Sequence, residues 1–372
     1  MERESSKAGL ELCRGQTFRA AFALACLSAI NAMAVLGHDG SHPRDLLVSF
    51  VPILLIGFLS VALPRWTRHA IAPPGVLEVL LVCHALALLL TWCAPRASLF
   101  LQVIATIAAS AVFVRHAIVA RVRGTAYVVA LVGIQAITGS LVPYASHLGP
   151  VFTRICLSAI ILLCLELGGR IAFALVSAAF EREGLVPPAP VRSGLVLAHR
   201  VFAAGALALW SLDIPFCILA FVAGFVGFKR LILLRPWGIR PIAGILAGLA
   251  GVAWMNLGFV GLGIVQAEIY PIPDLAIIHV WSVGGLGTIA IAVMTSVTRK
   301  RDQMSFQPSS LTNTSYALIA MTAIVRISAA MIMASPVFLF AARLGWIAAF
   351  SCCLTFIVSG LWGNNRTRIS WS

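Results

Sequence analysis

The sequence predicts an all-α fold, a membrane bundle of about twelve transmembrane helices with both termini in the cytoplasm. Of its 372 residues, 60% are hydrophobic and 11% are charged, against about 25% charged in an ordinary soluble domain. A soluble protein of this composition would expose large apolar patches, whereas a bilayer solvates them and requires only that backbone groups be paired. We therefore expect one integral-membrane domain, residues 1–372, with a short cytoplasmic segment 1–16.

The apolar runs give the number of helices. Each crossing needs about 20 mostly apolar residues, and runs of roughly that length follow one another along the whole chain. They cover residues 17–37, 46–63, 75–93, 97–119, 124–142, 152–178, 194–211, 214–229, 241–265, 274–298, 314–334 and 336–362. Prolines such as Pro64, Pro95 and Pro336 fall at their ends, where a missing backbone N–H does least harm.

The first run has a second interpretation, a secretory signal peptide, because Ala32-Met33-Ala34 resembles a cleavage site. Its length and the acidic residues before it favour a retained helix.

The basic loops give the direction of the helices. The N-terminal segment and every second loop are rich in Arg and Lys, whereas the intervening loops hold only Arg44, Arg96 and Arg154. By the positive-inside rule the basic loops are cytoplasmic, so the chain crosses the inner membrane an even number of times. The net charge of +14 thus reflects topology, and its scatter among apolar runs argues against nucleic acid as a partner.

Candidate metal ligands gather on the predicted outer face. His42 and Asp45 precede the second helix, and His279 lies about one turn inside the tenth, after Asp274. Imidazole and carboxylate groups suit a transition metal, and imidazole suits haem iron. We expect His279, helped by His42, to be the ligand, with Asp45 or Asp274 accepting the second ring N–H. A structural role for His279 stays open, although a polar ring within an apolar helix favours function.

Charged residues inside the spans give two further expectations. Glu166 and Arg170 are four residues apart in the sixth helix and predict an ion pair. Removing Arg170 alone should then harm folding more than changing both Glu166 and Arg170 to apolar residues, because the single change leaves a buried carboxylate without its partner.

Arg326 and Arg343 lie in the eleventh and twelfth helices without an acid nearby in sequence. They are candidates to meet haem propionates or a small anion. Snorkelling, or pairing with Asp213, Glu268 or Asp274, is the alternative.

Four segments of the chain are similar to the motifs of one family of bacterial membrane proteins. The run His279-Val280-Trp281-Ser282-Val283-Gly284-Gly285-Leu286-Gly287-Thr288 resembles a signature H-A-L-T-V-G-A-x-G-T. Gly168-Gly169-Arg170-Ile171 resembles a G-G-R-I/V motif, and the segments at 57–67 and 251–254 resemble G-F-L…P-N-W-T and G-Y-A-W motifs. In these segments the chain resembles the NnrS family, and the resemblance implies haem and copper as cofactors and a role in the response to nitric oxide, linked to denitrification and stress. It carries over only His42, Asp45, Arg170 and His279.

The chain also departs from the family pattern. Arg44 stands where the family's H-A-H-E motif has its second histidine, and Leu249 falls at or near another family histidine. Three functions therefore remain: a haem- or copper-binding protein of the nitric oxide response, a secondary transporter of a small solute, and a metal-free member that assembles with another membrane protein. No sequence motif indicates an enzyme.

Overall fold

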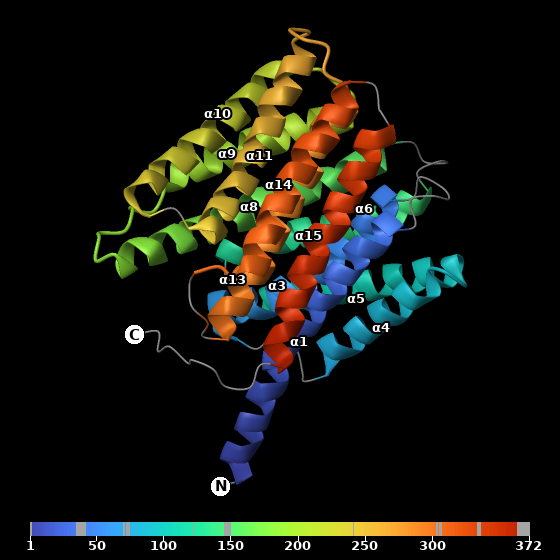
Figure 1. The fold of residues 1–372 in the computed structure, drawn as a ribbon, viewed down its shortest axis with the longest axis vertical. Coiled ribbons are helices and arrows are strands. Elements are labelled where there is room, and N and C mark those ends of the chain that lie inside the picture. Colours follow the sequence, from blue (N-terminus) through green and yellow to red (C-terminus); the bar gives the residue numbers. More distant parts are fainter. Residues whose placement is uncertain are drawn as a thin grey trace. The chain divides into compact units, whose positions relative to one another are not determined.

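The computed structural model describes residues 2–34, 42–69, 71, 75–121, 123–144, 150–240, 242–302, 304, 307–332 and 336–362 (Figure 1). It describes no side chains for residues 2–16, 42–43, 123–124 and 360–362. All regular elements in these ranges are helices. The chain divides into two compact units, residues 1–156 with 297–306 and 353–372, and residues 157–296 with 307–352. The all-α prediction is confirmed.

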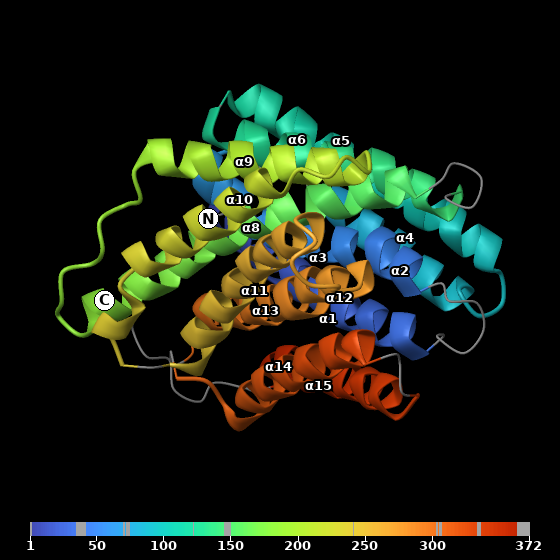
Figure 2. The same ribbon diagram turned by 90° about the horizontal axis from the view of Figure 1, so that it is seen from above.

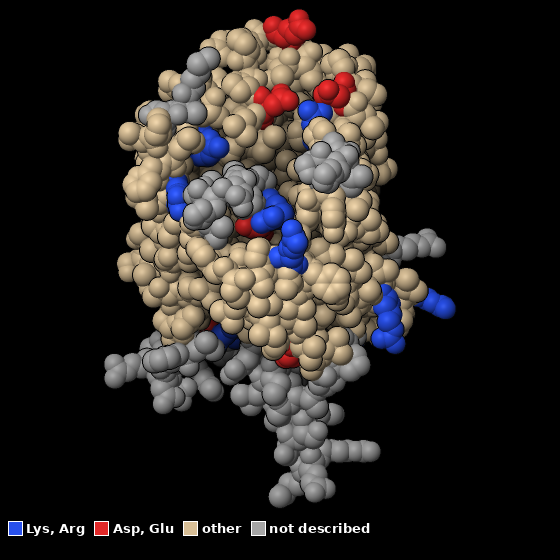
Figure 3. All heavy atoms as spheres, turned by 90° about the vertical axis from the view of Figure 1, so that its right-hand side faces the viewer, with Lys and Arg blue, Asp and Glu red and all other residues tan. Residues whose placement is uncertain are grey.

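Eleven helices in the described part are long and apolar enough to cross a membrane. The run predicted at 75–93 forms a shorter apolar helix, α4, of 15 residues, which at 1.5 Å per residue spans only about 22 Å. The face of the molecule in Figure 3 carries few charged side chains. Large apolar side chains such as Leu89 and Ile118 are exposed, as expected of helices that face lipid.

The first unit is built mainly from the helices of the N-terminal part of the chain. They are α1 (Glu2–Ala34), α2 (His42–Asp45), η1 (Leu46–Phe50), α3 (Val51–Thr67), α4 (Val76–Leu90), α5 (Pro95–Ala120) and α6 (Arg123–Leu141), followed by the short η2 (Val142–Tyr144). Gly57 of α3 lies against the Phe22 ring of α1, where a Cβ atom would come within 2.6 Å of that ring. The glycine therefore permits the close packing of α1 on α3.

The segment η1 is a π-helix, whose wider turn changes the backbone hydrogen bonding. Side chains of neighbouring helices bond its carbonyl groups: Gln135 Nε2 donates to Leu47 O at 3.1 Å and Thr106 Oγ1 donates to Val48 O at 3.5 Å. These buried polar side chains thus support an irregular turn that would otherwise be costly in an apolar setting.

The second unit is built from the remaining helices. They are α8 (Val151–Arg182), α9 (Ser193–Ser211), α10 (Cys217–Leu233), η3 (Pro236–Gly238), α11 (Ala243–Gln266), α12 (Asp274–His279), η4 (Val280–Gly287), α13 (Thr288–Arg301), α14 (Ser310–Met331) and α15 (Pro336–Trp362), of which α8, α13 and α15 also contribute residues to the first unit. Helix α10 packs between α9 and α11, as Figure 2 also shows.

Trp281 of η4 is fully buried. Its Nε1–H donates to Met255 O at 3.0 Å, and its ring contacts those of Trp210 and Phe259 edge to face. Gly258 faces the same indole so closely that a Cβ atom there would overlap it. The segment η4 is therefore held against α11 by a satisfied aromatic side chain packed on a glycine.

Candidate functional site

His279 ends α12, immediately before the π-helix η4, and its side chain is buried. Its Nδ1 lies 2.5 Å from the carbonyl oxygen of Leu275, one turn earlier. Because a carbonyl only accepts, Nδ1 carries the proton and Nε2 holds the lone pair. This is the arrangement found in metal-ligating histidines, in which a backbone carbonyl fixes the ring and its tautomer. The backbone carbonyl oxygen of Leu275 thus accepts a ring N–H of His279, the role that we expected of Asp45 or Asp274.

The glycines of η4 form a packing surface that protein side chains fill. A Cβ atom on Gly284 would come within 2.8 Å of the Trp254 ring, and one on Gly285 within 2.5 Å of Met255. A Cβ atom on Gly287 would come within 3.0 Å of the Trp346 ring. Close helix approach therefore accounts for these glycines, and a flat ligand at His279 would have to lie on another side of the helix.

Arg326 lies on α14, which packs against α12 and η4. Ile319 of α14 faces Gly287. The helix α14 runs antiparallel to α12 and η4. Arg326 comes about two turns after Ile319, and His279 comes about two turns before Gly287, so the two residues lie at a similar level along their helices. Arg343 lies on α15 near the same level, because the neighbouring Gly345 faces Thr322 of α14. Both arginines are half-buried.

His42 and Asp45 belong to the first unit, whereas His279 belongs to the second. The side chain of His42 lies outside the described residues, so its approach to His279 stays a prediction. Arg44 donates from Nε to Asp45 Oδ1 at 3.1 Å. Among the described side chains, no three His, Cys, Asp or Glu residues come together as a metal site.

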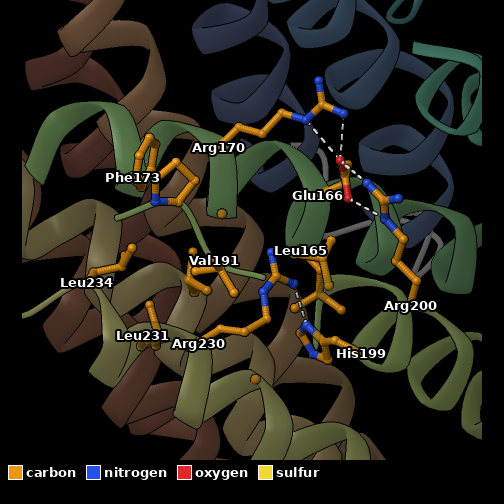
Figure 4. A pocket seen from close by; sticks show the side chains of 15 residues that line it. Leu165, Glu166, Arg170, Phe173, Val191, His199, Arg200, Arg230, Leu231 and Leu234 are labelled. Atoms are coloured by element: carbon orange, nitrogen blue, oxygen red, sulfur yellow. Dashed lines mark hydrogen bonds and ion pairs between the residues drawn. The ribbon is translucent and has the colours of Figure 1, made fainter. Parts of the chain in front are cut away.

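A second cluster of polar groups lies in the second unit, around Glu166 of α8 (Figure 4). Arg170 donates from Nε to Glu166 Oε1 at 2.8 Å, and Arg200 of α9 donates to both carboxylate oxygens, at 2.9 and 2.6 Å. The two guanidinium groups reach the carboxylate from different sides. The expectation that loss of Arg170 alone would strand Glu166 therefore requires correction, because Arg200 still holds the carboxylate.

Arg230 and His199 extend this cluster. Arg230, in the last turn of α10, donates from Nη1 to His199 Nδ1 at 2.6 Å. An arginine has no acceptor, so His199 accepts at Nδ1 and is neutral, with its proton on Nε2. Within the described part of the chain, this buried Nε2 has no hydrogen-bond partner.

The motif Gly168-Gly169-Arg170 has a structural explanation in the same region. Gly168 faces Val252 of α11 and Ile289 of α13, with closest Cβ distances of 3.0 and 3.1 Å. Gly169 faces the Arg230 guanidinium, which a Cβ atom would approach to 3.2 Å. The two glycines thus admit neighbouring helices and a guanidinium group, while Arg170 neutralises Glu166.

These side chains line a cavity of about 250 Å³ whose remaining walls are mostly apolar, including Leu165, Phe173 and Val191. Sequence analysis identified Glu166 and Arg170 but missed Arg200, Arg230 and His199 as their neighbours. The directions of the helices could have indicated that these residues lie at one side of the membrane. They place the start of α9 and the end of α10 on the same predicted side as the basic loops.

A family model described as the NnrS protein matches residues 13–364 of the chain. No curated protein matches it.

Proposed function

The chain belongs to the NnrS family, and on this premise we propose that it is a haem-binding protein of the inner membrane that takes part in the response to nitric oxide, with His279 as the iron ligand. The observation that carries the proposal is the geometry of His279. A buried imidazole whose Nδ1–H is fixed by Leu275 O presents Nε2 as the ligating atom. Its place at the start of a π-helix adds support, since π-turns are rare and frequent at functional sites.

Haem fits the described side chains better than copper does. Haem iron is held by one or two axial ligands, so His279 suffices as one of them. A copper site draws on several imidazole or sulfur ligands, and among the described side chains no three His, Cys, Asp or Glu residues come together. Copper binding would therefore depend on His42, whose side chain is not described.

The chain's own residues would orient and balance the cofactor. Leu275 O sets the imidazole plane, and the half-buried Arg326 and Arg343 offer positive charge to the propionates at a similar level. Bound haem would supply an iron that binds nitric oxide, a small neutral molecule that crosses the bilayer unaided.

The test is the haem content of the purified full-length protein. We expect a haem absorption band that His279→Ala removes while the protein remains folded in the membrane. His69→Ala is the matched control, because His69 also holds its Nδ1 on a backbone carbonyl, Thr67 O at 2.7 Å, but is exposed. His42→Ala should weaken binding or shift the spectrum. Full haem retention in His279→Ala, or a well-folded wild-type protein without haem, would contradict the proposal.

A further inference from the structure

The cavity around Glu166 carries more positive than negative charge. Three guanidinium groups, of Arg170, Arg200 and Arg230, line it together with a single carboxylate, that of Glu166, and His199 is neutral. The site therefore has an excess of two positive charges among apolar walls. In a low-dielectric setting such an excess favours an anion beside it.

The unsatisfied donor points to the same class of ligand. His199 is 2% exposed, and its Nε2–H has no partner among the described residues. A buried N–H without an acceptor is destabilising, because it has lost its hydrogen bonds to water and gained none in return. An oxyanion in the cavity would accept from this N–H and from Arg230, the guanidinium that does not bond Glu166.

The position of the cavity indicates the source of the anion. Arg230 lies in the last turn of α10, and Trp237, just after that helix, is 68% exposed. Exposed tryptophans mark the headgroup level of a bilayer. Lys229, near the end of α10, and Arg235, just after it, are exposed on the side that the basic loops predict to be cytoplasmic.

The walls fit a ligand that is apolar beyond its charged group. Leu165, Phe173 and Leu231 line the cavity, and the neighbouring Leu197 and Val201 of α9 are exposed as a lipid-facing surface would be. A volume of about 250 Å³ greatly exceeds the ~30 Å³ share of one water. Free phosphate would use the guanidinium groups but leave the apolar walls without a partner.

We propose that this cavity binds the phosphate group of an anionic phospholipid, with Arg230 and His199 as donors and Arg170 and Arg200 held beside it by Glu166. Basic pockets between helices on the cytoplasmic side bind such headgroups in other membrane proteins. His279 does not line this cavity, so the proposal of lipid binding can be tested independently of haem binding.

The experiment titrates purified full-length protein in detergent with dioleoylphosphatidylglycerol and measures binding by native mass spectrometry. Dioleoylglycerol, which has the same chains without the phosphate, is the matched ligand control. We expect saturable binding of the phospholipid and none of dioleoylglycerol. Equal binding of both would overturn the proposal.

Variants test the donors. Arg230→Gln should weaken binding about tenfold or more, because a charge-assisted bond is lost. Lys229→Gln removes the same charge from the adjacent, exposed position and should change binding less than about twofold. Equal effects of the two variants would overturn the assignment. Arg230→Lys keeps the positive charge but lacks the planar guanidinium group that can bond two phosphate oxygens, so it should give intermediate binding. This variant provides the test if Arg230→Gln does not fold.

A competition experiment with the unmodified protein distinguishes a phospholipid from free inorganic phosphate as the ligand. Millimolar inorganic phosphate should leave the bound phospholipid in place. Complete displacement by inorganic phosphate would show a free-anion site and overturn the lipid assignment.

Discussion

Glu166 and its two arginines allow a quantitative test of how the second unit is held together. The Glu166 side chain is 5% exposed, against 33% for Arg170 and 30% for Arg200. Arg170→Leu leaves the carboxylate bonded to Arg200, so it should destabilise the fold by about 1 kcal/mol, near the range of exposed ion pairs. Arg200→Leu removes the two-oxygen contact and should cost about 1–2 kcal/mol.

Replacing both arginines strands the buried carboxylate, which costs about 3–5 kcal/mol. The single losses add to about 2–3 kcal/mol, so at the middle of these ranges the double variant should lose about 1–2 kcal/mol more than the two single variants together. Adding Glu166→Leu should recover much of this loss, because apolar residues often replace a buried ion pair without penalty.

The assay is detergent-induced unfolding of the purified protein, followed by tryptophan fluorescence and analysed as a free energy of unfolding. All four variants keep the Arg230–His199 contact, so the differences report on Glu166. Strictly additive losses in the double variant, or a triple variant as unstable as the double, would refute the reasoning.

Three further outcomes follow from the topology and the packing. Reporter fusions after Asp45 and after Lys300 should lie on opposite sides of the membrane, and a common side would refute the predicted directions. Gly258→Ala should cost about 1–3 kcal/mol in the same unfolding assay, because the new methyl group meets the Trp281 indole; Gly133→Ala, where a Cβ atom meets nothing within 4 Å, should be neutral or stabilising. Trp281→Phe should destabilise by about 1–3 kcal/mol through loss of the bond to the Met255 carbonyl, and an unchanged stability would show that this bond matters little.

Only part of the candidate sites could be predicted from the sequence. His279 and the Glu166–Arg170 spacing were identified because each sits within one helix, where periodicity places residues one turn apart on the same face. Arg200 and Arg230 come from other helices, and sequence spacing carries no information on which helix faces of α8, α9 and α10 meet. His199 was missed for the same reason, since only the contact with Arg230 turns an ordinary buried histidine into a neutral donor.

The sequence by itself determined the fold class and the order of the spans, because the cost of placing polar groups in hydrocarbon acts on each segment separately. Local composition also placed His279 at the start of its span. The tertiary structure decided that α12 continues as a π-helix packed on α11 through glycines, and that three arginines and one glutamate line the same cavity. These features depend on side chains from several helices meeting in one place, and that meeting is fixed by packing between helices rather than by the preferences of any one of them.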